Sequence, residues 1–333
     1  MSTMKIPLSP AGGWLLALTN LVLRLLLRRR CRSSLKVSDV RLQVKRIDRA
    51  QSWRPPAGLK HRRDQLNGLY CEHFEPNDVA PDAPVILYFP GGGFILSAMR
   101  GQRQMLADIC LRSGSRALLV QYRTAPEHML PTAQEDALSA YRALLNEPDT
   151  DPRRLFLLGD SAGGNVALSA LQQARDAGLP QPAGAMLLSP ATDLSFHGGK
   201  LIDNLRRDPF FDISFLLWMR HTALPEGQSS HDPLLSPAWA SFTGLAPLLI
   251  EAGSTEALLD GSLLVAKRAP KEGVKVHLTV EPNAPHVYPA IGWLRQARAA
   301  RQRMQHFMKQ QLRLADGAEL PETSAERHRL VCE

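Results

Sequence analysis

The chain has 333 residues, of which 44% are hydrophobic and 22% charged, so it can fill the core of one large α/β domain or of two smaller ones. The net charge of +8 is uneven, because residues 1–63 carry fifteen Lys and Arg against two acidic residues, and the remainder is acidic. The basic segment has no zinc-finger or RNP-type signature, which excludes the common nucleic-acid-binding modules. The four cysteines lack metal or disulfide spacing and favour a reducing compartment; they are Cys31, Cys71, Cys110 and Cys332.

Residues 1–60 are predicted to form an N-terminal helical and basic segment. The apolar run over residues 14–27 contains Arg24 and precedes Arg28-Arg29-Arg30. It is shorter than the roughly 20 residues that a comfortable membrane span needs, and no small-residue cleavage site of a secretory signal follows. Two interpretations stay open: an amphipathic helix that folds back over the active site, or a helix that lies on a membrane surface, anchored by the arginines. Acylation of Cys31 is a lesser alternative.

The next elements alternate between strands and helices. Residues 85–89 form a continuous apolar run, typical of a strand buried on both faces, and lead into Pro90-Gly91-Gly92-Gly93-Phe94. Three glycines let the backbone approach a ligand closely, and a plain loop is the alternative. A helix over 101–112, a strand over 116–122 and a helix over 132–145 follow. This order predicts an α/β fold with a mostly parallel sheet.

Residues 155–164 carry the strongest functional signal. Residues 155–158 are predicted to be a short buried strand, Gly159-Asp160-Ser161-Ala162-Gly163 fits G-x-S-x-G, and a helix follows over 164–174. A strand, a sharp turn and a helix are the context that a nucleophile elbow requires. We therefore expect the hydroxyl of Ser161 to be the nucleophile, with the helix N-terminus directed at an oxyanion.

Four motifs in order resemble the hormone-sensitive-lipase family of α/β-hydrolases, over about residues 60–310. They are Pro90-Gly-Gly-Gly-Phe94, Tyr122-Arg-Thr-Ala-Pro-Glu-His128, Gly159-Asp-Ser-Ala-Gly-Gly164 and Ser189-Pro-Ala-Thr-Asp193. The resemblance implies an α/β-hydrolase fold over residues 61–314, with helices flanking a mostly parallel central sheet and a helical cap. It further implies a bacterial-type carboxylesterase or acetyl esterase. A polar tail follows over 315–333.

The resemblance also assigns the oxyanion hole to the backbone amides of Gly92, Gly93 and Ala162. The family usually has His where this chain has Pro90, so the glycine loop is expected to be held differently here. The segment 195–224, rich in Phe, Trp and Leu, corresponds to the family's cap, and a further core helix is the alternative. An apolar cap favours an acyl or terpenoid-like substrate over a sugar.

The acid and the base of the triad are expected after the last two strands, over 248–252 and 274–280. The fold orders its triad as Ser, acid, His. Some family members have Glu in a Gly-Ser-x-Glu setting, so the resemblance favours Glu256, with Asp260 as the alternative. Glu251 is less suitable because it lies within the strand. His286 follows two prolines in a loop that resembles the family's His loop, and a closing helix spans 291–312.

These residues predict a serine ester hydrolase. His286 would take the proton from Ser161, Glu256 would orient the imidazole, and an acyl-enzyme on short or medium acyl esters would form without metal or organic cofactor. The alternatives are a membrane-associated lipid or lactone hydrolase with the same triad, and a non-catalytic ligand-binding homologue, against which His286 argues. The sequence favours a cytoplasmic protein whose partner is a small ester. Contact of residues 14–32 with the inner face of the membrane, and a homodimer, are open alternatives.

Overall fold

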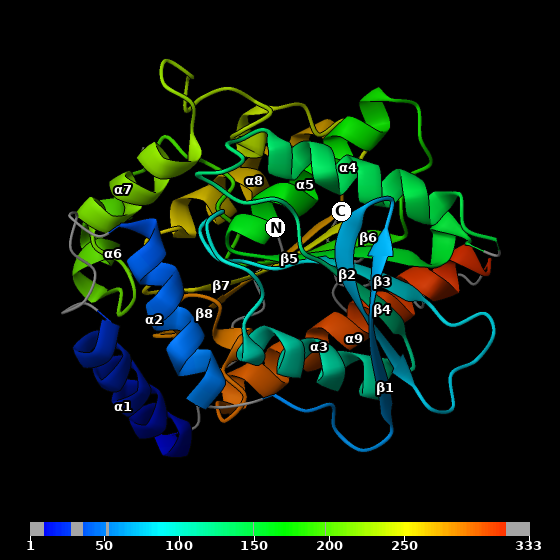
Figure 1. Ribbon diagram of the computed structural model, residues 1–333, viewed down its shortest axis with the longest axis horizontal. Helices are drawn as coiled ribbons and strands as arrows, with labels where there is room; N and C mark the ends of the chain where they lie inside the picture. The colour runs from blue at the N-terminus through cyan, green and yellow to red at the C-terminus, as the bar shows by residue number, and fades with distance from the viewer. Residues whose placement is uncertain (1–9, 28–35, 51–52, 149, 197, 318–333) are drawn as a thin grey trace, which may run out of the picture.

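The structure of the protein is a computed structural model that describes residues 10–27, 36–50, 53–148, 150–196 and 198–317 (Figure 1). Its centre is an eight-stranded sheet in the order β1-β2-β4-β3-β5-β6-β7-β8. The strands are β1 (Leu59–Leu66), β2 (Leu69–Pro76), β3 (Val85–Phe89), β4 (Arg116–Val120), β5 (Leu155–Asp160), β6 (Gly184–Leu188), β7 (Leu248–Gly253) and β8 (Val276–Glu281). The strands from β4 to β8 in this order pair in parallel, which confirms the mostly parallel sheet. An antiparallel hairpin, β1–β2, extends one edge and joins β4 antiparallel.

Helices cover both faces of the sheet, as parallel strands require. The helices are α1 (Pro10–Leu27), α2 (Val37–Ala50), α3 (Arg100–Ser113), α4 (Thr132–Leu145), α5 (Ala162–Asp176), α6 (Leu201–Arg207), α7 (Ile213–Ala223), α8 (Leu259–Arg268) and α9 (Arg295–Ala315). In Figure 1, α4, α5 and α8 lie on one face, and α3 and α9 lie on the other. Two separate hydrophobic clusters of buried residues correspond to these faces. Helix α9 begins four residues later than predicted, because a short 3₁₀ turn and further turns occupy residues 288–294.

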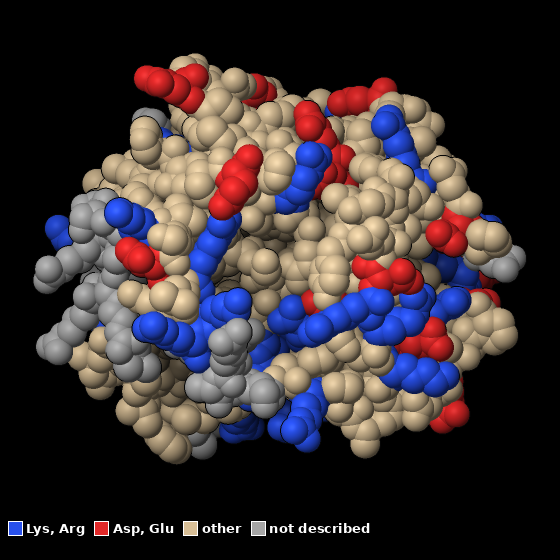
Figure 2. Space-filling model, in the orientation of Figure 1, with Lys and Arg blue, Asp and Glu red and all other residues tan. Residues whose placement is uncertain are grey.

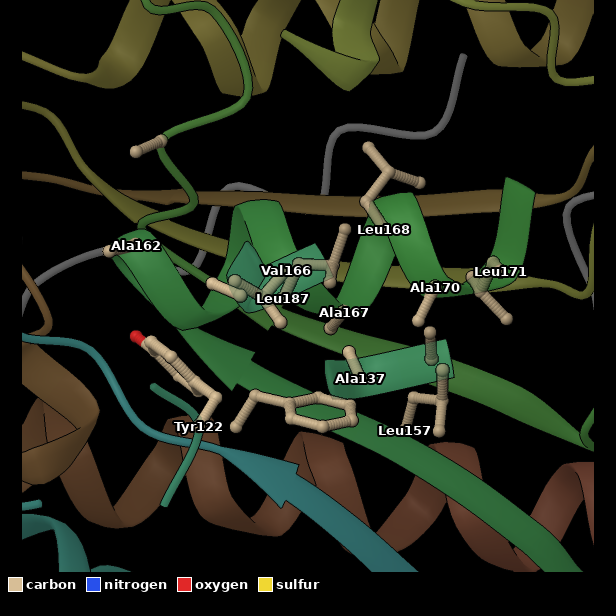
Figure 3. Close-up of a cluster of buried hydrophobic side chains, with 14 of the residues drawn as sticks. Tyr122, Ala137, Leu157, Ala162, Val166, Ala167, Leu168, Ala170, Leu171 and Leu187 are labelled. Atoms are coloured by element: carbon tan, nitrogen blue, oxygen red, sulfur yellow. The ribbon is translucent and has the colours of Figure 1, made fainter. Parts of the chain in front are cut away.

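Helix α5 is the most deeply buried helix next to the site (Figure 3). Its Val166 and Ala170 pack toward Leu157 of β5, Leu187 of β6 and Ala137 of α4, and all five side chains are almost completely buried. Alanines along the helix allow it to approach the sheet closely. The N-terminus of α5, which follows Ser161, is therefore held by the core and not by a surface loop.

The segment 195–224 contains α6 and α7, and most side chains of these two helices are at least partly exposed. Only Leu216 and Ala223 of α7 are buried, which argues against the alternative of a further core helix. Helix α2 is tied to the body by Arg41, which donates to the backbone carbonyls of Ile95 (2.8 Å) and Ala125 (2.7 Å). Helix α1 packs through Leu16 onto a small cluster that includes Tyr288 and Leu294.

Several predictions concern parts of the chain outside the described residues. These are the arginine run over 28–30, Cys31, Cys332 and the polar tail from residue 318 onward. Of the helices that are described, none combines the length and the apolar character that a membrane crossing requires.

Candidate active site

Ser161 lies in a strained turn between β5 and α5. Its φ of +53° and ψ of −122° fall in a region that L-residues rarely adopt, and its amide donates to the carbonyl of Leu188 at 2.8 Å. A Cβ at Gly163 would lie 1.9 Å from the carbonyl oxygen of Phe89 on β3, so only glycine fits there. The G-x-S-x-G pattern thus reflects a close approach of α5 to β3, and this turn carries Ser161 at the end of the central strand.

His286 lies within hydrogen-bond distance of Ser161. Its Nε2 is 2.9 Å from the Oγ of Ser161, although 125 residues separate them in the sequence. The Nδ1 of His286 is 3.7 Å from Oε2 of Glu256, and both side chains are buried, with 5% and 0% exposed. Asp260 instead caps the start of α6, because its Oδ2 accepts from the amide of Lys200 at 3.0 Å. The structure therefore brings Ser161, His286 and Glu256 together, and Asp260 contacts a different segment.

Ser189 connects Glu256 to the loop that carries His286. It directly follows β6, with a φ of +47°, and its hydroxyl donates to Oε2 of Glu256 at 2.5 Å. The same hydroxyl accepts from the amide of Val287 at 2.9 Å. The amide of Gly253 also donates to Oε2 of Glu256, at 3.2 Å. The sequence signals for Ser189 are its place in the family-like motif Ser189-Pro-Ala-Thr-Asp193 and its position just after a core strand, where sites of such sheets form.

Glu256 and His286 do not form a hydrogen bond with each other in this structure. Within the described part of the chain, neither Nδ1 of His286 nor Oε1 of Glu256 has a hydrogen-bond partner, although both atoms are buried. Catalytic hydrogen bonds are often long before substrate binds and shorten later. The 3.7 Å separation therefore leaves Glu256 within reach of the imidazole after a small movement.

Three backbone amides form the predicted oxyanion hole. No described residue accepts a hydrogen bond from the amide of Gly92, Gly93 or Ala162. Ala162 is the first residue of α5, so its N–H lies at the positive end of the helix. Gly93 has a φ of +61°, and a Cβ there would lie 2.5 Å from Sδ of Met219, so α7 packs directly over the glycine loop. Among the described residues, the three predicted oxyanion donors thus have no competing acceptor.

The glycine loop is held by Asp160 and Tyr122. The hydroxyl of Tyr122 donates to the carbonyl of Pro90 at 2.7 Å. The carboxylate of Asp160 accepts from the amide of Gly91 at 2.8 Å, from the hydroxyl of Tyr88 at 2.5 Å and from Nε2 of Gln102 at 2.9 Å. Burial raises the pKa of Asp160, and these three donors oppose that shift. Proline at position 90 is therefore compatible with a fixed loop, because the restraints act on its carbonyl and on Gly91.

We expect Asp160→Asn to lower the free energy of unfolding by about 1–3 kcal/mol and to reduce kcat. The amide that replaces Oδ2 would meet Nε2 of Gln102, so two donors would face each other at the base of the glycine loop. Urea unfolding and ester-hydrolysis rates measure the two effects. Asp176→Asn is the matched control, since Asp176 is exposed and pairs with Arg175 at the end of α5. Wild-type stability and rate in Asp160→Asn would show that this network does not hold the loop.

An aromatic wall covers one side of the imidazole. The ring centroids of Phe210 and Phe211 lie 6.0 and 4.8 Å from that of His286. Asp208 holds this turn, because its carboxylate accepts from the amides of Phe210 (2.6 Å), Phe211 (3.1 Å) and Ala257 (2.7 Å). Burial raises the pKa of Asp208, opposed mainly by the nearby imidazole. The turn between α6 and α7 is thereby bonded to Ala257, the residue that follows Glu256.

The described residues contain no cluster of His, Cys, Asp and Glu arranged to hold a metal ion. The chemistry available at the site is that of a hydroxyl, an imidazole, a carboxylate and three free amides. These groups suit acyl transfer through a serine.

Comparison with known proteins agrees with this geometry. Residues 86–290 match the family described as alpha/beta hydrolase fold. An acetyl-hydrolase of Streptomyces hygroscopicus is 38% identical over 207 residues, which cover 62% of this chain and 69% of that protein. An esterase of Acinetobacter venetianus is 32% identical over 193 residues, 58% of this chain and 63% of that protein. The aligned segment thus spans about two thirds of the length of these two relatives.

A solved structure extends the similarity to almost the whole chain. The crystal structure of an esterase from the bacterial hormone-sensitive lipase family superposes with a TM-score of 0.82 at 31% identity, and the match covers 92% of this chain and 100% of that one. The family match, the related acetyl-hydrolase and this structure agree with one another. The chain therefore belongs to the α/β-hydrolase fold family, among the carboxylesterase-type hydrolases that resemble hormone-sensitive lipase.

Proposed function

We propose that this protein hydrolyses carboxylic esters of short to medium acyl chains through Ser161, His286 and Glu256. The observation that carries the proposal is the 2.9 Å contact between the Oγ of Ser161 and the Nε2 of His286. A serine hydroxyl is a weak nucleophile at neutral pH unless a base in contact removes its proton. This contact supplies such a base at the end of a strained turn.

In the proposed acylation step, Oγ of Ser161 attacks the ester carbonyl carbon while Nε2 of His286 takes the hydroxyl proton. The carbonyl oxygen becomes an oxyanion, bound by the amides of Gly92, Gly93 and Ala162. The carbon–oxygen bond to the alcohol then breaks, and the alcohol leaves with the proton from His286. Glu256 stabilises the imidazolium formed in between.

In the proposed deacylation step, water takes the place of the Ser161 hydroxyl as the nucleophile, and His286 again acts as the base. His286 takes a proton from water as the water oxygen attacks the acyl carbon, and the acid product leaves as the proton returns to Ser161. The amides again bind the oxyanion, and each such donor contributes about 3 kcal/mol of transition-state stabilisation in comparable enzymes.

The aromatic side chains beside His286 favour a substrate with an apolar acyl or alcohol group. Phe211 stacks on Phe215, and Phe215 stacks on Trp218, which continues the apolar surface from His286 along α7. A relative from Pseudomonas putida, 28% identical over 221 residues, is named an ethyl acetate hydrolase. A structural neighbour, EstE5, was soaked with p-nitrophenyl butyrate, at 30% identity and a TM-score of 0.81. Acetyl and butyryl esters are therefore the first substrates to test.

Two measurements test the proposal. The first is hydrolysis of p-nitrophenyl esters from acetate to palmitate, for which we expect activity that is highest on the short and medium chains. The second is mass spectrometry after treatment with phenylmethylsulfonyl fluoride, which should place one sulfonyl group on Ser161. A chain that binds esters without hydrolysing any of them would be a ligand-binding homologue, and a preference for the longest chains would favour a lipid hydrolase.

A further inference from the structure

Helix α1 presents more apolar surface than the body of the protein covers. Its Leu16 and Thr19 are buried against the segment that follows His286, and this contact needs only a narrow stripe of the helix. Large apolar side chains nevertheless recur at helical spacing on its solvent side, each 43–65% exposed: Trp14, Leu18, Leu21, Val22 and Leu25. The exposed face of a surface helix is normally polar.

The exposed apolar residues are concentrated on one part of the molecule. Of the fourteen large hydrophobic side chains that are exposed in the described part of the chain, ten lie on α1, α2, α6, α7 or at Trp293. Trp293 is 66% exposed, and its indole donates to the hydroxyl of Thr19 on α1 at 3.2 Å. Ile202 of α6 is 70% exposed, and Arg24 of α1 donates to the carbonyl of Arg206 at the end of α6. A concentration of this kind marks an interaction surface.

The charge around this surface is positive. Arg24 lies on α1 itself, three arginines follow the helix directly in the sequence, and residues 1–63 carry fifteen Lys and Arg against two acidic residues. Lys45 and Arg46 are exposed on α2, and Figure 2 shows Lys and Arg side chains gathered over that helix. Two copies of this chain joined through α1 would bring two strongly basic segments together, so charge disfavours a dimer and favours an anionic partner.

We infer that the exposed face of α1 docks on the surface of an anionic lipid bilayer. The helix would lie in the plane of the interface, with its leucines among the upper acyl chains, Trp14 and Trp293 at the headgroup level, and the exposed Arg24, Lys45 and Arg46 near the lipid phosphates. This mode needs no membrane-spanning helix, in agreement with the described helices.

Docking through α1 would also place the active site close to the bilayer. Asn20 of α1 donates to the carbonyl of Asn283 at 2.9 Å, and Leu16 packs against Tyr288, so the helix contacts the chain on both sides of His286. In Figure 1, α1 lies at the outer edge of the molecule, where nothing in the described chain covers its far side. An apolar ester dissolved in the membrane would then have a short path to Ser161.

Vesicle flotation with the full-length chain tests the inference. The protein is mixed with vesicles of phosphatidylcholine alone or of phosphatidylcholine with phosphatidylglycerol. The test variant is Leu18→Glu with Leu25→Glu, and the matched control is Leu111→Glu with Leu314→Glu, which changes two leucines of similar chemistry that are 38% and 37% exposed on other helices. We expect the wild type and the control to float with the anionic vesicles, more weakly as salt rises, and the α1 variant to bind about tenfold or more weakly.

Hydrolysis of soluble p-nitrophenyl acetate and the melting temperature should be the same in all three proteins, because α1 contributes no reacting group. If the glutamates prevent folding, Trp14→Ser with Leu21→Ser removes the apolar surface more gently. Failure of the wild type to float, or equal binding of a folded α1 variant, would overturn the inference. So would a wild-type dimer in sedimentation that the α1 variant converts to a monomer, since that result assigns the face to a second copy.

Discussion

The Ser161→Ala variant is expected to lose about 10⁴-fold or more in kcat on p-nitrophenyl butyrate. The methyl group cannot form the acyl-enzyme, so only the oxyanion amides and substrate binding would accelerate attack by water. The change should leave the fold intact, because the side chain of Ser161 makes no capping hydrogen bond to α5. Stopped-flow hydrolysis and thermal unfolding, measured on the same preparations, give both quantities.

Ser169→Ala is the control for this result. Ser169 lies on the same helix, two turns away from Ser161, and is 1% exposed. Its hydroxyl donates to the carbonyl of Leu234 at 3.4 Å and accepts from Nε2 of Gln173 at 3.2 Å, so it contacts no group of the site. We expect this variant to retain the wild-type kcat. A Ser161→Ala protein that keeps more than a tenth of the activity would remove Ser161 from the mechanism.

The central part of the fold could be predicted because its signals are local. Strands β3, β5 and β6 are continuous apolar runs, and the structure buries almost every residue in them. The β1–β2 hairpin is harder to predict because its first strand has no such local signal. Strand β1 has the sequence LKHRRDQL, and only its two terminal leucines are buried, so neither an apolar run nor a regular alternation marks it as a strand.

In the site, too, the features that depend on neighbouring residues can be predicted from the sequence, and the contacts between distant residues cannot. Ser161 and its neighbours form a turn with a recognisable pattern, whereas the bonds of Ser189 to Glu256 and of Asp208 to Ala257 join residues 67 and 49 positions apart. Nothing in the sequence near Asp208 indicates a partner on another loop. Such contacts follow from the assembled fold, and they hold Glu256 and the turn between α6 and α7 in place.

Glu256→Gln is expected to lower kcat by about 10³–10⁴-fold, with little change in KM for a soluble ester. The uncharged amide cannot stabilise an imidazolium. If the NH₂ group of the introduced glutamine donates to Nδ1 of His286, it also favours the imidazole tautomer that carries its proton on Nε2. The Nε2 atom can then no longer accept the proton of Ser161. The variant keeps the size of the side chain, so loss of packing contributes little. The pH dependence of kcat and the rate of Ser161 labelling both report the loss of the base.

Asp260→Asn separates the two candidate acids. Its carboxylate contacts the amide of Lys200 at the start of α6, and the asparagine oxygen can accept that same bond, so we expect kcat within about threefold of the wild type. The reverse pattern, with Asp260→Asn inactive and Glu256→Gln active, would contradict the assignment. It would require the segment between β7 and α8 to rearrange, because Glu256 is fully buried 3.7 Å from the imidazole, while Asp260 in the first turn of α8 binds the amide of Lys200.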